Sequence, residues 1–419
     1  MIKIYNLALI FLAVLLSPII LVLFVIKPKL RAGFFEKIGF YGKFKKTTDR
    51  KTMHFHAVSV GEVNAIENLV KSAREKHPEY EFVLTTTTKT GQEVANAKLK
   101  DTVDKITYFP YDFCFSVKSF LNTVKPDKIV IAETEIWPNF AKYAHKKNLE
   151  LYIVNGRISP KSFDGYKKIK FFISRVLKNY TKILMQTEGD AQRMRELADE
   201  PEKIVVMGNL KFDIKQNLTA EEVEQLKSQF CIGEAPLFVA ASTHSGEDEL
   251  VLSVYEKVKK EVGNLKMIIA PRHPQRFAHV EGLLKKSGFS YGKRSEGSNF
   301  SNCEIIMLDT MGELSKIYSL AKIAFIGGSF SNTGGHNPLE ANIWGVPVIS
   351  GVTVFNFKDI YKLLTAKNAA KIVADEKEFA DMLLKFLGDD EFYSECTNSI
   401  KQIFSESSGA VGRVLSEVF

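Results

Sequence analysis

Acidic and basic side chains follow several of the short apolar runs in the first half of the chain. Glu62 comes a few residues after one such run, and Glu133 directly follows another. Arg157 and Lys211 come shortly after two more. A carboxylate beside fixed positive charges can remove a proton from a hydroxyl, while the cations stabilise the negative charge that builds up in the transition state. These four residues are therefore candidates for proton-transfer chemistry.

The segment Ser59-Val-Gly-Glu62 also has a purely structural interpretation. Ser59 and Glu62 have the spacing of a capping box, in which each side chain binds the backbone N–H of the other residue at a helix start. Gly61 removes side-chain bulk from the first turn, where a ligand would approach the backbone. The sequence thus leaves two roles open for Glu62, a helix cap and a general base.

The second half of the chain has residues suited to binding an anion. The segment 333–340 leads from a glycine-rich stretch into a predicted helix, with Asn337 at its N-cap and Pro338 at its first position. The N–H groups at such a helix start favour a phosphate, and Arg272 is a candidate phosphate clamp. The pattern is neither a Walker A loop nor a GxGxxG motif, which disfavours ATP hydrolysis and dinucleotide binding.

No metal site or disulfide framework is expected. The eight histidines form no HxxxH arrangement, and the spacing of His54 and His56 only places them on one face of a strand. The four cysteines are far apart and include no CxxC pair. We therefore expect neither a metal nor a cofactor. The unpaired cysteines also indicate that the protein is in a reducing compartment.

The elements that must position these residues alternate between strands and helices. Short β-rich runs separated by longer amphipathic stretches indicate βαβ units around a parallel sheet. The runs are 53–58, 82–86, 128–132, 151–154, 183–185 and 204–207, then 237–241, 267–270, 305–308, 323–326 and 346–349. Between the two sets lies a polar stretch, followed by the capping-box spacing of Thr219 and Glu222. The prediction is two Rossmann-like α/β domains, 28–215 and 216–419, which face a cleft and bind ligands at the carboxyl ends of their strands.

An apolar segment without charge extends from residue 4 to residue 26. As a helix, its 23 residues would extend about 35 Å, enough to span a bilayer. A cleaved signal peptide is the alternative, but the segment is long and meets the basic run 27–31 instead of a small-residue cleavage site. Basic residues after the segment outnumber Lys3 before it. The positive-inside rule then predicts a single-pass anchor, residues 1–27, with the rest of the chain in the cytoplasm.

The composition is that of a globular protein, with 45% apolar and 25% charged residues and a net charge of +8. Two stretches, 31–46 and 166–182, mix cations with aromatic residues. The second has helical spacing and fits two interpretations, a helix on an anionic membrane surface and an ordinary helix that faces the core. The charge also fits nucleic-acid binding, but the basic residues are dispersed, and Glu62 and Glu133 would repel a polyanion in the cleft.

A series of motifs extends over nearly the whole chain behind the apolar segment. In order they are HAVSVGEV, TTTTKTG, ETEIWPN, NGRIS, GNLKFD, ASTHSGEDE, APRHPQR, MGEL, and GGSF followed by GGHNPLEA. The series resembles the bacterial 3-deoxy-D-manno-octulosonic acid (Kdo) transferases of lipopolysaccharide biosynthesis. This resemblance implies a glycosyltransferase B fold at the cytoplasmic face of the inner membrane. It also implies inverting transfer of Kdo from CMP-Kdo to the lipid A precursor, a tetraacylated disaccharide bisphosphate.

The resemblance also assigns roles to residues and domains. Glu62 would be the general base, and Glu133 and Lys211 would stabilise the transition state. The first domain would bind the acceptor and the second CMP-Kdo. The implied donor contacts are Pro271, Arg272, Met311, Gly312, Glu313, Asn337, Pro338, Leu339 and Glu340. Because CMP leaves as a phosphate monoester, cations and helix N–H groups can stabilise it without a divalent metal.

A transferase or an epimerase that uses a UDP-sugar is the alternative with the same fold. A soluble epimerase has no use for the apolar N-terminal segment, and a comparison of CMP and UDP binding would distinguish the donors. The number of Kdo residues transferred does not follow from the sequence.

Overall fold

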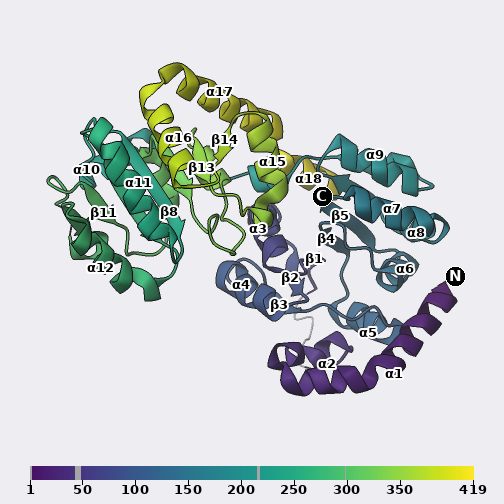
Figure 1. Cartoon of the computed structure of the whole chain (residues 1–419). Coiled ribbons are helices and arrows are strands. Elements are labelled where there is room, and N and C mark those ends of the chain that lie inside the picture. Colours follow the sequence, from purple (N-terminus) through teal and green to yellow (C-terminus); the bar gives the residue numbers. More distant parts are fainter. Residues whose placement is uncertain (1, 43–48, 215–217, 298) are drawn as a thin grey trace. The chain divides into compact units, whose positions relative to one another are not determined.

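The chain folds into two compact α/β units, drawn in sequence colours in Figure 1. The structure is a computed structural model that describes residues 2–42, 49–214, 218–297 and 299–419. Unit 1 comprises residues 1–213 and 407–419, and unit 2 comprises residues 214–406. Lys43 and Lys46, which belong to the first stretch of cations and aromatic residues, lie outside the described residues.

Unit 1 is built around a parallel seven-stranded sheet with strand order β3-β2-β1-β4-β5-β6-β7. The strands are β1 (Thr52–His56), β2 (Glu81–Thr86), β3 (Lys105–Tyr108), β4 (Lys128–Ala132), β5 (Glu150–Gly156), β6 (Lys182–Met185) and β7 (Ile204–Val206). The helices are α1 (Ile2–Ile26), α2 (Phe34–Lys37), α3 (Val60–Lys76), α4 (Lys89–Leu99), α5 (Cys114–Val124), α6 (Pro138–Lys146), α7 (Pro160–Lys168), α8 (Lys170–Leu177), α9 (Glu188–Leu197) and α18 (Ala410–Val418), with short 3-10 turns that include η3 (Leu210–Phe212). Apolar clusters bury both faces of the sheet, as is usual for parallel strands.

Unit 2 contains a second parallel seven-stranded sheet, in the order β10-β11-β9-β8-β12-β13-β14. The strands are β8 (Leu237–Thr243), β9 (Lys266–Pro271), β10 (Tyr291–Lys293), β11 (Ile305–Met307), β12 (Ile323–Ile326), β13 (Val348–Ser350) and β14 (Ala370–Ile372). The helices are α10 (Ala220–Gln229), α11 (Glu247–Glu261), α12 (Phe277–Ser287), α13 (Leu314–Ile317), α14 (Leu339–Asn342), α15 (Lys358–Ala366), α16 (Glu376–Gly388) and α17 (Asp390–Ser407). The predicted class, two Rossmann-like α/β sheets, is confirmed.

Each predicted apolar run overlaps a strand, but three strands were missed. These are β3, β10 and β14, and each lies at an edge of its sheet. An edge strand has a neighbour on one side only, so it needs fewer apolar side chains and often carries lysine. All three contain a lysine, which interrupts the apolar pattern on which the prediction rested.

The last helix, α18, departs from the predicted domain boundary because it packs in unit 1. Its apolar side, which includes Val414 and Leu415, is buried against α3 and η3. The Arg413 side chain donates to the Met207 carbonyl at 2.9 Å, and Asp213 accepts the Gly409 N–H at 2.6 Å. The chain therefore returns to unit 1 after α17. A single domain boundary at 215/216 cannot describe this, because unit 1 consists of two separate segments of the chain.

The predicted basic helix at 166–182 is divided between two helices, α7 and α8, with a break at Ile169. In α8, Ile173 and Val176 are buried in the core of unit 1, while Phe171 is exposed. The segment therefore has one side that faces the core, as the interpretation as an ordinary helix requires. It also has an exposed apolar side, which is the feature that a helix on a membrane surface would need.

The apolar N-terminal segment forms the helix α1. In the described part of the chain it is the one helix long and apolar enough to cross a membrane. By length and composition it fits both a membrane anchor and a signal sequence.

Candidate active site

The order of the strands places a switch point in each sheet, between β1 and β4 in unit 1 and between β8 and β12 in unit 2. On either side of a switch point, successive connections run in opposite directions along the sheet. Ligands of open parallel sheets bind there, outside the carboxyl ends of the strands. Glu62 follows β1 and Glu133 follows β4, so the first two predicted site residues lie at the switch point of unit 1.

Glu62 lies in the first turn of α3, and only 8% of it is exposed. Its Oε2 accepts the Val58 N–H at 2.7 Å, and its Oε1 accepts the Ser59 hydroxyl at 3.3 Å. Ser59 is the N-cap residue, but its side chain accepts no backbone N–H of the helix. The capping box considered for this segment is therefore absent, whereas Thr219 and Glu222 do form the one predicted at α10.

The electrostatic surroundings favour the protonated form of Glu62. Its pKa is raised to about 8, chiefly because the carboxyl is buried and also because Glu133 and Glu135 carry negative charge nearby. The hydrogen bonds from Val58 and Ser59 oppose this shift. Burial and the charge of Glu133 also raise the pKa of Glu135. Three carboxyl groups thus interact at the carboxyl ends of the central strands β1 and β4. Interacting titratable groups of this kind are frequent in sites that transfer protons.

Glu133 occupies a strained position at the end of β4. Its φ of 56° lies in the left-handed region, and Asn155 near the end of the neighbouring strand β5 has a φ of 55°. Such conformations cost on the order of 1 to 3 kcal/mol for residues other than glycine and cluster at functional sites. The Glu133 carboxylate pairs with Arg157, whose Nε lies 3.3 Å from Oε2. The ends of β4 and β5 therefore provide a carboxylate, Glu133, and a guanidinium, Arg157, that form an ion pair.

Lys211 lies in η3, which follows the edge strand β7. Asn155 holds the start of this turn, because its Oδ1 accepts the Leu210 N–H at 3.1 Å. The Lys211 ammonium makes no hydrogen bond or ion pair with any residue that the structure describes. The structure thus brings Glu133 together with Arg157 and leaves the Lys211 side chain without a partner in the described part of the chain.

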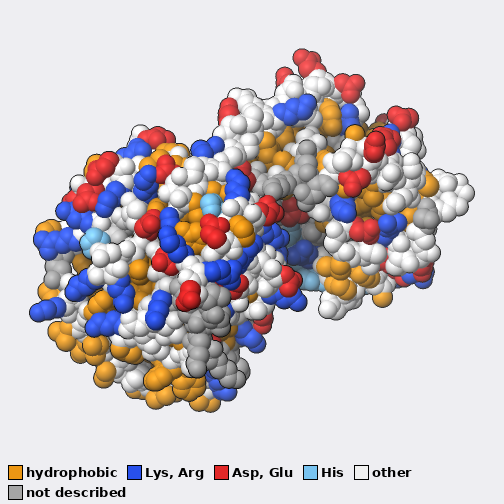
Figure 2. Space-filling view, turned by 180° about the vertical axis from the view of Figure 1, so that it is seen from behind, with side chains coloured by type: hydrophobic (Ala, Val, Ile, Leu, Met, Phe, Trp, Pro, Cys, Tyr) orange, Lys and Arg blue, Asp and Glu red, His pale blue; other side chains and the backbone are white. Residues whose placement is uncertain are grey.

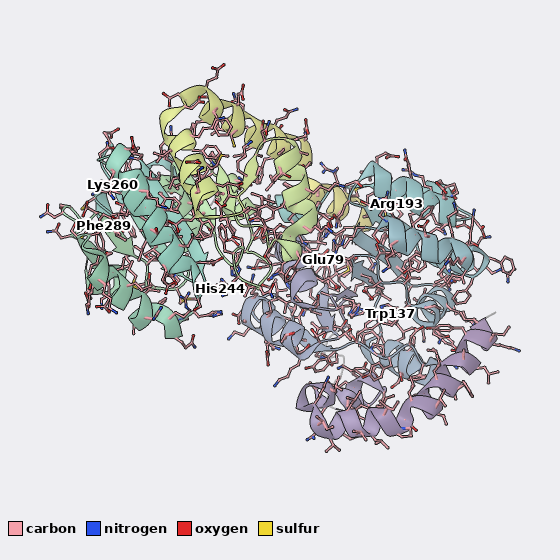
Figure 3. The ribbon with its side chains drawn as sticks, viewed as in Figure 1. Glu79, Trp137, Arg193, His244, Lys260 and Phe289 are labelled. Atoms are coloured by element: carbon pink, nitrogen blue, oxygen red, sulfur yellow. The ribbon has the colours of Figure 1, made fainter. Side chains whose placement is uncertain are left out.

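Arg272 and three histidines lie at the carboxyl ends of β8, β9 and β12 in unit 2. The Nε2 atoms of His244 and His336 are 2.9 Å apart, and the ring of His273 stands edge-on to His244 (Figure 3 labels His244). Burial lowers the pKa of His336 to about 4, and the charge of Arg272 contributes to this shift. Arg272 is exposed and has no ion pair with a described residue. The Arg272 guanidinium beside the neutral imidazole of His336 is suited to an anionic ligand.

Glu247 is a positioning residue that the sequence analysis missed. It is 1% exposed in the first turn of α11, and its carboxylate accepts four backbone N–H groups at 2.7 to 2.8 Å. The donors are His244 in the preceding loop and Gly328, Ser329 and Phe330 after β12. Glu247 therefore fixes the glycine-rich segment beside the end of β8. The available signal was an acid in the first turn after a buried strand, the same signal that singled out Glu62.

The predicted donor contacts at 311–313 follow β11. Met311 is exposed, and Gly312 has a φ of 88° that favours glycine. The Glu313 carboxylate is bound by Arg294, with a closest distance of 3.0 Å, and by the Thr310 hydroxyl. Burial alone would raise the pKa of Glu313, but these hydrogen bonds lower it. The Glu313 side chain thus orders this loop.

The predicted contacts at 337–340 surround the start of α14, while Pro271 is the last residue of β9. The helix begins at Leu339, so Pro338 takes the N-cap position that had been predicted for Asn337. Asn337 nevertheless caps the turn, because its Oδ1 accepts the Leu339 N–H at 3.2 Å. The Asn337 amide also lies 3.4 Å from Glu340 Oε1. The helix start therefore differs from the predicted one by one residue, which is within the usual variation of helix ends.

The sequence model of the 3-deoxy-D-manno-octulosonic-acid transferase (kdotransferase) family matches residues 32–214. A 3-deoxy-D-manno-octulosonic acid transferase of Haemophilus influenzae is 33% identical over 391 residues, which are 93% of this chain and 91% of that protein. This chain belongs to the Kdo transferase family. A family member from Rickettsia bellii is 31% identical over 336 residues, which are 80% of this chain and 79% of that protein.

Solved structures support the fold of this Kdo transferase. The UDP-GlcNAc 2-epimerase of Neisseria meningitidis bound to UDP-GlcNAc matches with a TM-score of 0.58 over 88% of this chain and 99% of that chain. The two sequences are 12% identical, so the likeness concerns the fold alone. Two parallel seven-stranded α/β sheets of this kind make the fold glycosyltransferase-B-like, as the sequence predicted.

The raised pKa of Glu62 predicts a pH-dependent stability. Between the ordinary value of 4.5 and the raised value of about 8, the folded state keeps a proton that the unfolded state has released. The free energy of unfolding of the wild type therefore falls as the pH rises through this window. Glu62→Gln has no such proton, and its amide oxygen can still accept the Val58 N–H. We expect the stability of Glu62→Gln relative to the wild type to rise between about pH 5 and pH 8, by at most about 1.4 kcal/mol per pH unit.

Urea denaturation at a series of pH values measures this difference. Glu75→Gln is the matched control, because Glu75 is an exposed glutamate on the same helix, α3. A stability difference between Glu62→Gln and the wild type that does not change with pH would contradict the raised pKa.

Proposed function

We propose that this Kdo transferase moves Kdo from CMP-Kdo onto the lipid A precursor, a tetraacylated disaccharide bisphosphate, with inversion at the anomeric carbon. The observation that carries the proposal is a buried carboxyl, Glu62, at the switch point of unit 1 in a member of this family. Unit 1 would bind the acceptor and unit 2 the donor. The anchor α1 would hold the enzyme at the inner membrane, with both units on the cytoplasmic side.

In the proposed mechanism, Glu62 is the general base. Its carboxylate takes the proton of the acceptor hydroxyl while the oxygen attacks the anomeric carbon from the face opposite the phosphate. The C–O bond to CMP breaks, and its electron pair leaves with the phosphate. Only the ionised form of Glu62 can act as the base. Once ionised, a carboxylate with a pKa of about 8 takes up the hydroxyl proton more readily than an ordinary carboxylate does.

Glu133 and Lys211 would stabilise the transition state. Glu133 is ion-paired with Arg157, so the pair presents little net charge, and the Lys211 ammonium supplies an additional positive charge. The donor would contact Pro271 and Arg272 at the end of β9, residues 311–313 after β11 and residues 337–340 at the start of α14. Arg272 and the N–H groups of these loops would bind the phosphate of CMP.

The proposed mechanism is metal-independent. CMP departs as a phosphate monoester, which a guanidinium and N–H groups stabilise without the divalent ion that diphosphate leaving groups often recruit. We therefore expect full transfer activity in the presence of EDTA. Loss of activity on chelation, with recovery on addition of Mg²⁺, would contradict this part of the proposal.

The isosteric substitution Glu62→Gln tests the base directly. The amide keeps the hydrogen bond from Val58 but cannot take up a proton, so the transfer rate should fall by about 10² to 10⁴ while CMP affinity stays near that of the wild type. Rates of the purified enzyme at saturating donor measure the effect, with Glu75→Gln as the matched control. A rate within about threefold of the wild type would exclude Glu62 and redirect the search to Glu133 or Glu135.

Arg272→Ala tests the donor site in unit 2. The substitution removes a charge-assisted hydrogen bond and should weaken CMP binding by about 1.5 to 3 kcal/mol, roughly 10- to 150-fold. Lys286→Ala is the control, since it removes the same charge from an exposed position on α12. Calorimetry with CMP that shows equal affinity for both variants would remove Arg272 from the site. The same titration with UDP tests the alternative donor.

A further inference from the structure

Two histidines from distant parts of the sequence form a hydrogen-bonded pair in unit 2. The Nε2 atoms of His244 and His336 lie 2.9 Å apart, and the two rings are inclined to each other by 12°. Nearly coplanar rings at this distance fit an N–H···N hydrogen bond, in which one Nε2 atom carries the proton and the other accepts it. Both Nε2 atoms cannot be protonated while this bond exists. The neutral pair can therefore gain one proton, and not two.

The backbone segments that carry the two rings are held together by one carboxylate. Glu247 accepts the His244 N–H at 2.8 Å and the Gly328 N–H at 2.7 Å. The His336 N–H donates to the Gly327 carbonyl at 3.2 Å, next to the second of these bonds. The His336 ring also packs on Gly328, where an added Cβ would lie 3.2 Å from it. The backbone thus fixes the positions from which the two rings meet.

The second ring nitrogen of His336 is available to a ligand. Apart from the bond between them, the side chains of His244 and His336 make no hydrogen bond with any residue that the structure describes, and both residues are half-buried. Among the charged neighbours of His336, Arg272 has the largest effect on its pKa. The Arg272 N–H also donates to the carbonyl of Thr243, the residue before His244, at 3.1 Å. An anion bound by Arg272 would therefore lie near the free Nδ1 of His336.

The surroundings keep the pair neutral in the free enzyme. The charged and titratable groups that face it are Glu247 on α11 and, at the end of β9 and in the turn that follows, Arg272, His273 and Arg276. Glu247 is already bound by four backbone N–H groups, and Arg276 is paired with Asp248. Burial and the neighbouring positive charges lower the pKa of both histidines of the pair, that of His336 to about 4. At neutral pH the free pair therefore has no additional proton to donate.

A bound donor would reverse this balance. CMP-Kdo carries a phosphate and the carboxylate of Kdo. A phosphate paired with Arg272 cancels the positive charge that opposes protonation, and the donor adds negative charge beside the rings. Negative charge near an imidazole raises its pKa, which favours the uptake of one proton from solvent. This step rests on the proposed function, because it requires the donor to bind at Arg272.

We propose that His336, with His244 as the partner that shares its proton, is the general acid for the departing phosphate. Donor binding loads the pair with one proton. As the C–O bond to the anomeric carbon breaks, its electron pair stays on the phosphate oxygen, and Nδ1 of His336 gives its proton to the phosphate. The pair returns to its neutral state. Glu62 releases the proton of the acceptor hydroxyl to solvent, so one proton enters and one leaves in each turnover.

Proton uptake on ligand binding tests the loading step. Lysine and arginine side chains are spread over the face drawn in Figure 2, so affinity for an anion cannot identify the pair, whereas proton uptake can. At about pH 7.5 free CMP has already lost its phosphate protons, because the second pKa of a phosphate monoester is about 6. Calorimetry of CMP binding to the full-length enzyme in Hepes and in Tris, which differ in ionisation enthalpy, should show an uptake of up to about one proton by the wild type.

The variants of the pair should bind CMP without this uptake. His336→Gln removes the acid, and His244→Gln removes its partner but leaves the contact of His336 with Gly328 in place. The second variant covers the case in which the first disturbs the fold. His279→Gln is the matched control, because His279 is an exposed histidine on α12, and it should take up the same number of protons as the wild type.

Transfer rates at saturating donor test the acid itself. Each single variant should lower kcat by about 10² to 10⁴, and the double variant should lower it no further, because the two rings hold one proton together. The wild type should also lose activity at alkaline pH, where the pair gives up its proton. Both variants should lack this decline, which a merely structural role of the rings would not affect.

The outcomes separate this inference from the proposed function. Binding of CMP by the wild type without proton uptake would overturn the inference and leave the proposed donor intact. A kcat of His336→Gln within about threefold of the wild type would do the same. Absence of CMP binding to the wild type would contradict the proposed function, and the inference with it.

Discussion

The reversal of strand order in each sheet is the constraint on which the site depends. At the two switch points, β1 beside β4 and β8 beside β12, the connections diverge and leave the carboxyl ends of the strands uncovered by their own helices. Glu62 and Glu133 occupy one switch point, and Glu247 with the glycine-rich segment occupies the other. The same topology thus places reactive side chains in unit 1 and an ordered backbone loop in unit 2.

Glu62 and Glu247 are both buried in the first turn of a helix that follows a strand, but they differ in their hydrogen-bond partners. Glu247 accepts four backbone N–H groups, which stabilise its charge and leave it no capacity for another partner. Glu62 accepts one N–H and one hydroxyl, and it lies near the charges of Glu133 and Glu135. Glu247 therefore clamps the glycine-rich segment, whereas Glu62 has hydrogen-bonding capacity left for a further partner.

The sequence predicted the interior of both sheets because buried parallel strands are continuous apolar runs. It missed the edge strands β3, β10 and β14, whose lysines interrupt that pattern, and the return of α18 to unit 1, which depends on contacts between distant residues. Spacing alone could not distinguish a capping box from the bond between Glu62 and Val58, because both place a serine and a glutamate three residues apart. The contact of Tyr5 with Asp112 was also beyond prediction, because 107 positions separate the two residues.

The activity proposed for this family member is the transfer of Kdo from CMP-Kdo to a lipid A precursor. The most direct test incubates the purified full-length enzyme with CMP-Kdo and a tetraacylated disaccharide bisphosphate, and analyses the lipid product by mass spectrometry and its new linkage by NMR. We expect a mass increase of a whole number of Kdo residues and an anomeric configuration opposite to that of the donor. Consumption of a UDP-sugar with no reaction of CMP-Kdo, or retention of the anomeric configuration, would contradict it.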